Sequence, residues 1–359
     1  MTDMDALLAL APYGLDREAK QALLTRELLA LSRHHAAGCP EYARMLSAWG
    51  TDLDRIQSHE EIPFLPVRLF KEFSLKSVPQ EQLYRTMTSS GTTGQQVSRI
   101  YLDRETSTAQ SKALSKIVAS FLGNSRLPMI ILDSSALVSS RTQFSARGAG
   151  ILGFSIFARD RFFALDESMA LDVEGLKAFL SRHRGSPIFL FGFTFIIWQH
   201  FYQELLRLGE KPDLSAGILI HGGGWKKLTS QAVSPQGFKA ALGEVCGITQ
   251  IHDYYGMVEQ TGTIYLECEQ GHLHAPVWSD VTIRDPWDFS VAPMGQRGLI
   301  QVSSLLPRSY PGHILLTEDE GSLLGEDDCP CGRKGKYFTV FGRVARAEVR
   351  GCSDTYEHT

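Results

Sequence analysis

The chain has few cysteines, no long apolar run and no excess of positive charge, and each shortage excludes a class of protein. Six cysteines in 359 residues are too few for a disulfide framework. The most apolar stretch, Ile188 to Trp198, is eleven residues long, whereas a membrane-spanning helix takes about 20. The 36 basic and 40 acidic side chains leave no positive field for a nucleic acid. We therefore expect no nucleic-acid partner and no membrane span.

The first residues, Met1 to Asp5, are acidic where a secretory signal carries a basic region and then an apolar one. They do not indicate export, so we expect a cytoplasmic protein whose cysteines stay reduced or bind metal. With 43% hydrophobic and 21% charged residues, the composition is that of an ordinary globular domain.

Hydrophobic periodicity predicts an α/β protein. Leucines at three- and four-residue spacing predict a first helix over 16–37. Farther along, short apolar runs predict strands that alternate with helical patterns. The predicted strands are at 129–133, 188–191, 216–221 and 249–254. The predicted helices are at 103–122, 173–184, 194–208 and 234–243. This alternation predicts mostly parallel sheets flanked by helices. After about residue 260, glycines and prolines separate short runs such as 298–302, which predicts a smaller antiparallel β lobe.

A segment rich in serine, threonine and glycine follows a predicted strand at 85–88. Closely spaced backbone amides and hydroxyl groups suit a phosphate or a magnesium ion, and the segment comprises Ser89, Ser90, Gly91, Thr92, Thr93 and Gly94. No lysine follows as in a Walker loop. A solvated turn is the alternative from composition alone.

Two further segments follow predicted strands, where open α/β folds place ligands. Gly222, Gly223 and Gly224 leave room for a flat base, although a plain tight turn has the same composition. Tyr255 and Gly256 lead to Glu259, whose carboxylate can bind a hard cation. The alternative for Glu259 is a solvated residue at the start of a helix.

Aromatic and thiol side chains offer two other candidate sites. Phe191, Gly192, Phe193 and Trp225 supply surface for an apolar ligand, with ordinary core packing as the alternative. Cysteines and histidines in two glycine-rich turns suit tetrahedral zinc, and the candidate ligands are Cys268, His274, Cys329 and Cys331, with His272 as a substitute. The alternative is two turns with reduced thiols.

In this order, from Arg85 onward, these segments resemble the adenylate-forming superfamily of acyl-CoA synthetases, luciferases and adenylation domains. The resemblance implies that the 89–94 loop binds the phosphates of ATP, that Gly222–Gly224 lies beside adenine, and that Glu259 and Thr92 hold Mg²⁺. Asp319 resembles the aspartate that binds ribose, and Arg343 the arginine of the hinge. Val258 departs from the usual threonine of the Tyr-Gly-x-Thr-Glu motif.

The sequence after the hinge resembles a narrower family, the LuxE-type acyl-protein synthetases. Only sixteen residues follow Arg343, so the usual large C-terminal domain and its catalytic lysine are not expected. Lys226, Lys227, Lys334 and Lys336 are candidates to replace that lysine. The segment 147–154 and the tail around Cys352 also resemble this family, in which a tail cysteine accepts the acyl group; an incidental cysteine is the alternative.

The resemblance implies an AMP-forming acid–thiol ligase. It would activate a carboxylic acid, a long-chain fatty acid in the first place, with ATP and Mg²⁺, and pass the acyl group through Cys352 to an acyl reductase. One alternative is an acyl-CoA or aryl-CoA ligase of the phenylacetate-CoA ligase type, whose zinc-bearing members have a similar cysteine arrangement. Another is a catalytically silent subunit that binds nucleotide or acyl groups.

We expect four segments along the chain. They are a helical N-terminal region of the core at 1–84, an α/β adenylation core at 85–260, a β lobe of the same domain at 261–341, and a hinge with a short mobile tail at 342–359.

Overall fold

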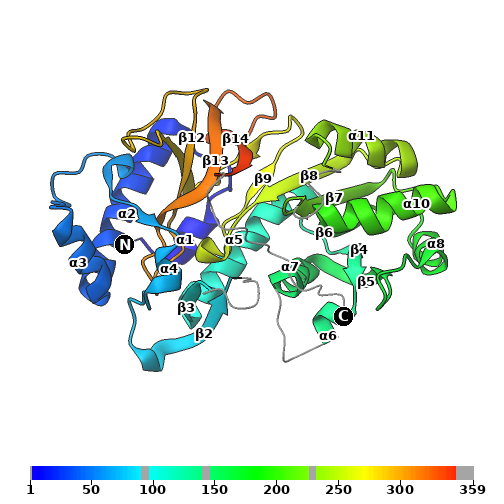
Figure 1. Cartoon of the computed structure of the whole chain (residues 1–359), viewed down its shortest axis with the longest axis horizontal. Helices are drawn as coiled ribbons and strands as arrows, with labels where there is room; N and C mark the ends of the chain where they lie inside the picture. The colour runs from blue at the N-terminus through cyan, green and yellow to red at the C-terminus, as the bar shows by residue number, and fades with distance from the viewer. Residues whose placement is uncertain (1, 90–96, 140–145, 226–231, 345–359) are drawn as a thin grey trace. The chain divides into compact units, whose positions relative to one another are not determined.

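The computed structural model describes residues 2–89, 97–139, 146–225 and 232–344 (Figure 1). Contacts between residues divide the chain into two compact units. The α/β unit is Phe121–Tyr255, and the β unit joins the chain up to Ser120 with the chain from Gly256. The boundaries predicted after residues 84, 260 and 341 stay predictions, because they divide the chain by sequence character and not by contacts.

A parallel sheet forms the centre of the α/β unit. Its strands are β4 (Leu127–Ser134), β5 (Ala158–Leu165), β6 (Ile188–Phe193), β7 (Gly217–Gly222) and β8 (Gln250–Tyr255), in the order β5-β4-β6-β7-β8. Every residue of β4, β6 and β7 is buried, as expected for inner parallel strands, which are apolar on both faces. The predicted parallel sheet is confirmed.

Helices cover both faces of this sheet, and the strand side chains that they contact alternate. One face, with Ile130, Leu190 and Leu219, packs against α8 (Val173–Arg182), α11 (Pro235–Cys246) and a helix over 194–208. The other face contacts α7 (Ala146–Phe154), where Phe154 stacks on Phe191 with 4.2 Å between ring centroids. The remaining elements are α6 (Ala136–Ser139) and η3 (Ser155–Phe157).

The helix over 194–208 was predicted as one regular helix, and its middle departs from that prediction. It consists of α9 (Thr194–Ile196), a π turn η4 (Ile197–Tyr202) and α10 (Gln203–Leu208). Hydrophobic spacing alone does not show a π turn, because only one extra residue enters the helix.

An antiparallel sheet forms the centre of the β unit, as predicted. The order β11-β12-β13-β14-β10-β9 contains β9 (Tyr265–Glu267), β10 (Leu273–His274), β11 (Ser279–Arg284), β12 (Arg297–Ser304), β13 (Ile314–Glu326) and β14 (Lys336–Arg343). A short strand β1 (Leu65–Pro66) pairs in parallel with β13. Beside this sheet, β2 (Leu83–Thr88) and β3 (Arg99–Asp103) form a separate ribbon.

Helices of the N-terminal part complete the β unit. They are α1 (Met4–Ala9), α2 (Arg17–Gly38), α3 (Pro40–Ala48), η1 (His59–Glu61), α4 (Leu69–Glu72), η2 (Gln80–Gln82), α5 (Arg104–Leu122) and, after β8, η6 (Val258–Gln260). Asp16 caps α2 by accepting a hydrogen bond from Ala19 N. Within the described part of the chain, no helix has the length and apolar character needed to cross a membrane.

A buried ionic cluster ties α2 and η1 to the antiparallel sheet. Asp280 on β11 lies 2.8 Å from Lys336 Nζ, 2.9 Å from His59 Nε2 and 3.5 Å from Lys20 Nζ, and Lys336 also contacts Glu60 at 2.7 Å. Burial would raise the pKa of Asp280, but Lys336 and Lys20 lower it well below its usual range. Asp280 therefore stays ionised, and its ion pairs hold these elements together.

Candidate active site and metal centre

The predicted phosphate segment begins at the end of the β2–β3 ribbon. Ser89 N donates to the Ser98 carbonyl at 3.1 Å, and Ser98 N donates to Ser89 Oγ at 2.9 Å. These two bonds join the first residue of the segment to the residue before β3. The other predicted residues, Ser90, Gly91, Thr92, Thr93 and Gly94, lie outside the described residues.

The glycine turn lies at the carboxyl end of β7, as predicted. Gly222 is buried against Tyr254, and a Cβ added at Gly222 would overlap that ring. Gly223 has a positive φ of 79°, which disfavours any side chain there. Gly223 and Gly224 are exposed. Close packing thus requires glycine at 222 and the backbone conformation favours it at 223, whereas a Cβ at 224 would meet nothing within 4 Å. The open surface at Gly223 and Gly224 suits a flat ligand.

Glu259 is nearly fully buried, with 3% of its surface exposed, and the backbone around it is well held. Its carbonyl oxygen accepts a hydrogen bond of 2.9 Å from Tyr310 Oη. Gln260 Nε2 donates to the Gly312 carbonyl at 2.9 Å and to the Val302 carbonyl at 3.2 Å. This burial excludes the solvated helix-start alternative, and a carboxylate on a fixed 3₁₀ turn suits a hard cation. The metal role of Glu259 stays a prediction.

Asp319 and Arg343 come together on neighbouring strands. They are paired residues in the β13–β14 ladder, and Arg343 Nε lies 3.8 Å from Asp319 Oδ1. Asp319 N donates to Thr317 Oγ1 at 3.1 Å. Both side chains keep some exposure, 33% for Arg343 and 19% for Asp319. The structure therefore places the predicted ribose carboxylate and the predicted hinge cation side by side.

The four residues predicted to line an apolar pocket do not share one surface. Phe191 and Phe193 are buried on the α7 face of the sheet with Phe154. Gly192 points to the opposite face, where an added Cβ would meet Leu132. Trp225 packs with the helices of that opposite face. Phe191 and Phe193 are thus core-like in this structure, and the substrate role of all four stays a prediction.

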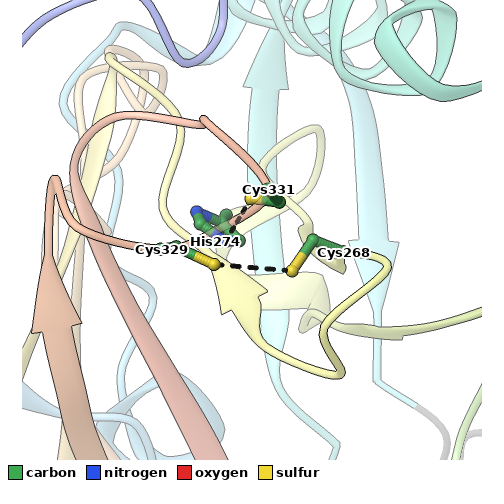
Figure 2. A group of neighbouring side chains, drawn as sticks. All are labelled: Cys268, His274, Cys329 and Cys331. Carbon is green, nitrogen blue, oxygen red and sulfur yellow. Dashed lines mark hydrogen bonds between the residues drawn. The ribbon is translucent and has the colours of Figure 1, made fainter.

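The predicted zinc ligands form the clearest cluster among the described residues. Cys268 and His274 come from β9–β10, and Cys329 and Cys331 come from the β13–β14 connection (Figure 2). The four ligand atoms all lie within 4.8 Å of one another. Cys268 Sγ is 3.9 Å from Cys329 Sγ, and Cys331 Sγ is 3.4 Å from His274 Nε2.

These distances fit a tetrahedral metal. Zinc–ligand bonds of about 2.3 Å to sulfur and about 2.0 Å to nitrogen imply about 3.8 Å between sulfurs and about 3.6 Å between sulfur and nitrogen. Burial, with Arg333 nearby, lowers the pKa of His274 to about 4, which keeps the imidazole in its metal-binding form. His272, the predicted substitute, lies 3.4 Å from Cys329 Sγ and stacks on Tyr337. The donor set therefore fits a structural zinc ion.

Among the lysines predicted as candidates to contact the α-phosphate, Lys336 forms ion pairs in the buried core of the β unit. It belongs to the Asp280 cluster, and Asp280 and Glu60 raise its pKa although burial would lower it. Lys334 Nζ contacts the Asp327 carbonyl at 3.4 Å. Lys226, Lys227 and the predicted acyl acceptor Cys352 lie outside the described residues.

Sequence reasoning missed two polar pairs in the α/β unit. Arg147 on α7 contacts Asp133 at the end of β4 with two nitrogens, each at 2.9 Å. Thr194 Oγ1 lies 3.0 Å from His221 Nδ1 and 3.3 Å from the Gly222 carbonyl oxygen, directly behind the glycine turn. A polar residue at the end of a fully apolar strand was the available signal in both cases, but it does not name the partner.

The sequence matches the family described as Acyl-protein synthetase, LuxE, over residues 2–359. The chain belongs to this family. It is similar to the long-chain-fatty-acid–luciferin-component ligase of Vibrio harveyi, with 22% identity over 363 residues that cover 98% of this chain and 92% of the relative. The ligase of the same name from Aliivibrio fischeri is 24% identical over 312 residues, which cover 84% of this chain and 79% of the relative. The predicted family is confirmed.

Solved structures confirm the adenylate-forming fold of this LuxE family member. 2-Hydroxyisobutyryl-CoA ligase in the postadenylation state with 2-HIB-AMP matches with a TM-score of 0.70 and 16% identity, over 92% of this chain and 69% of that chain. An open conformation of the same ligase with 2-HIB-AMP and CoA matches with a TM-score of 0.69 and 16% identity, over 95% and 79% of the two chains. At this identity the likeness concerns the fold alone.

Proposed function

We propose that the protein activates a long-chain fatty acid with ATP and transfers the acyl group to its own Cys352. The observation that carries this proposal is the LuxE family match over residues 2–359, supported by two relatives named as long-chain-fatty-acid ligases. In the first step a carboxylate oxygen attacks the α-phosphorus of ATP, and pyrophosphate leaves. In the second step the Cys352 thiolate attacks the acyl carbon, and AMP leaves as the thioester forms.

The described residues suit distinct roles in the first step. Glu259, with Thr92, would hold Mg²⁺, which neutralises phosphate charge when bound. Asp319 would accept hydrogen bonds from the ribose hydroxyls, and Arg343 beside it would offset negative charge. Gly222–Gly224 would receive the adenine. The pairing of Asp319 and Arg343 on neighbouring strands supports this assignment, because the two side chains can contact one nucleotide together.

The acyl thioester needs an acceptor, and we propose an acyl reductase protein as the partner that receives it. A thioester is reactive enough for reduction to an aldehyde, whereas the free carboxylate is not. The reactivity of the thioester supports this choice of partner.

The experiment separates the two steps. The protein is incubated with Mg·ATP and a panel of fatty and aryl acids, and its intact mass is measured before and after neutral hydroxylamine. We expect a labile acyl adduct on the wild type and on Cys246→Ala, a buried thiol whose pKa burial raises to about 11, but none on Cys352→Ser. Exchange of labelled pyrophosphate into ATP should persist in Cys352→Ser and fall by about 10²-fold or more in Glu259→Gln.

Other results would replace the proposal. An adduct that persists in Cys352→Ser would remove Cys352 as acceptor. AMP release only in the presence of coenzyme A would establish an acyl-CoA ligase. ATP binding without pyrophosphate exchange for any acid would establish a catalytically silent binding subunit.

A further inference from the structure

The π turn at Ile197–Tyr202 carries part of a cluster of aromatic rings on the face of the parallel sheet that packs against α8 and α11. Trp198 and Tyr202 stack along the turn with 4.4 Å between centroids and an interplanar angle of 29°. Trp198 is 8% exposed and also contacts Phe238 of α11 at 6.0 Å. π turns are rare, and they occur frequently at functional sites.

Trp225 inserts into this cluster. Its ring meets Trp198 edge-on at 5.4 Å and 76°, and Phe238 at 6.3 Å and 85°. Phe238 in turn lies 4.8 Å from His221, the residue before the glycine turn. Edge-to-face contacts of this kind fix orientation as well as position.

The glycine turn therefore has an anchor at each end. At its start, Gly222 packs on Tyr254, and Thr194 Oγ1 lies 3.3 Å from the Gly222 carbonyl. At its end, Trp225 is half-buried among the aromatic rings of η4 and α11. Between the anchors lie the exposed Gly223 and Gly224, whose lack of side chains gives the turn no packing of its own.

We propose that Trp225 is a positioning residue that holds the glycine turn in the conformation that binds the nucleotide. We propose also that the π turn places Trp198 where its ring packs against Trp225. This inference rests on the proposed function, because it takes Gly222–Gly224 as the place where ATP binds. Ordering a flexible turn would cost part of the free energy of nucleotide binding. The Trp225 ring, held by Trp198, avoids that cost because the turn is already ordered. Trp225 then acts through the backbone and does not belong to the acyl pocket.

The test measures Mg·ATP affinity by calorimetry without any acid, and then the KM values for ATP and for the fatty acid. We expect Trp198→Ala and Trp225→Leu to weaken ATP binding and raise the KM for ATP about ten-fold, which corresponds to about 1.4 kcal/mol. The KM for the acid and kcat should change less than about two-fold. Trp198→Phe keeps a ring and should restore most of the affinity.

Trp287→Ala is the matched control, because Trp287 is 92% exposed in the other unit and lies outside the cluster. Near-ultraviolet circular dichroism and thermal melting confirm that each variant is folded, and Trp225→Leu keeps the test valid if Trp198→Ala unfolds. Unchanged ATP affinity in Trp225→Leu, or equal losses for ATP and acid, would overturn the inference while leaving the proposed function intact. A wild type that does not bind ATP would overturn both.

Discussion

Protonation of the buried histidines of the β unit should make its stability fall with acid. His313 lies between α2 and β13, with its Nε2 2.9 Å from Ser32 Oγ and its ring 4.7 Å from the ring of His35. Burial, and then His34 nearby, lowers the pKa of His313 to about 3. Burial, then His313 and His34, also lowers the pKa of His35 well below its ordinary value. Both imidazoles are neutral at pH 7.

Proton linkage gives the sign and the size of this change in the free energy of unfolding. An unfolded chain protonates His313 near its ordinary pKa of about 6.5, while the folded chain resists protonation down to about pH 3. The unfolded state therefore binds more protons as the pH falls, and folding loses about 1.4 kcal/mol per pH unit for each such histidine. For His313 alone, the loss between about pH 6.5 and pH 4.5 is about 2 to 3 kcal/mol.

Urea unfolding at constant ionic strength, repeated over this pH range, measures the effect as a free energy of unfolding. His313→Asn should be less stable than the wild type at neutral pH but should lose about 2 to 3 kcal/mol less on acidification. Trp287→Ala, which removes a side chain that is 92% exposed and carries no titratable group, serves as the control and should follow the wild-type slope. Parallel pH curves for the wild type and His313→Asn would refute the assignment of His313 as a neutral buried group.

Three further outcomes test the metal centre, the glycine turn and the buried ion pair. Purified protein should carry about one zinc ion per chain by mass spectrometry of the metal, and Cys329→Ser should lose it and melt at a lower temperature. Gly222→Ala should destabilise the fold by about 1 to 3 kcal/mol in thermal melting, because the new methyl group overlaps Tyr254. Asp133→Asn should cost about 3 to 5 kcal/mol because it removes the carboxylate that contacts the buried Arg147, whereas Asp133→Leu with Arg147→Met should recover most of that loss.

Sequence patterning predicted the parallel and antiparallel character of the two sheets, but it did not predict β5 (Ala158–Leu165). β6 is apolar throughout and β7 is apolar except for His221, and such runs are typical of strands that are buried on both faces. The glycines and prolines after residue 260 correctly predicted an antiparallel sheet. The π turn was beyond reach, because Trp198 and Tyr202 fit the spacing of an ordinary helix equally well.

The candidate site was predictable where ligands come from short motifs and unpredictable where partners are distant in sequence. The cysteine and histidine turns predicted a cluster whose members the structure brings within bonding range of one metal. By contrast, Lys336 looks like a free cation in the sequence, and its partners Asp280 and Glu60 lie on elements far from it along the chain. Pairing of this kind depends on strand order, which periodicity does not encode.

The buried ion pairs of Lys336 argue against Lys336 as the cation that faces the α-phosphate. If Lys336 moved, its ammonium would lose its contacts with the two carboxylates of a buried cluster, Asp280 and Glu60, at a cost of several kcal/mol. Arg343 differs, because it keeps a third of its surface exposed and contacts Asp319 at a long 3.8 Å. Its guanidinium has several donors, so it can bind phosphate oxygens while remaining beside Asp319. If Arg343 supplies this charge, Arg343→Lys should retain part of the pyrophosphate exchange and Arg343→Gln should lose most of it, whereas equal exchange in both variants would point to a cation elsewhere in the chain.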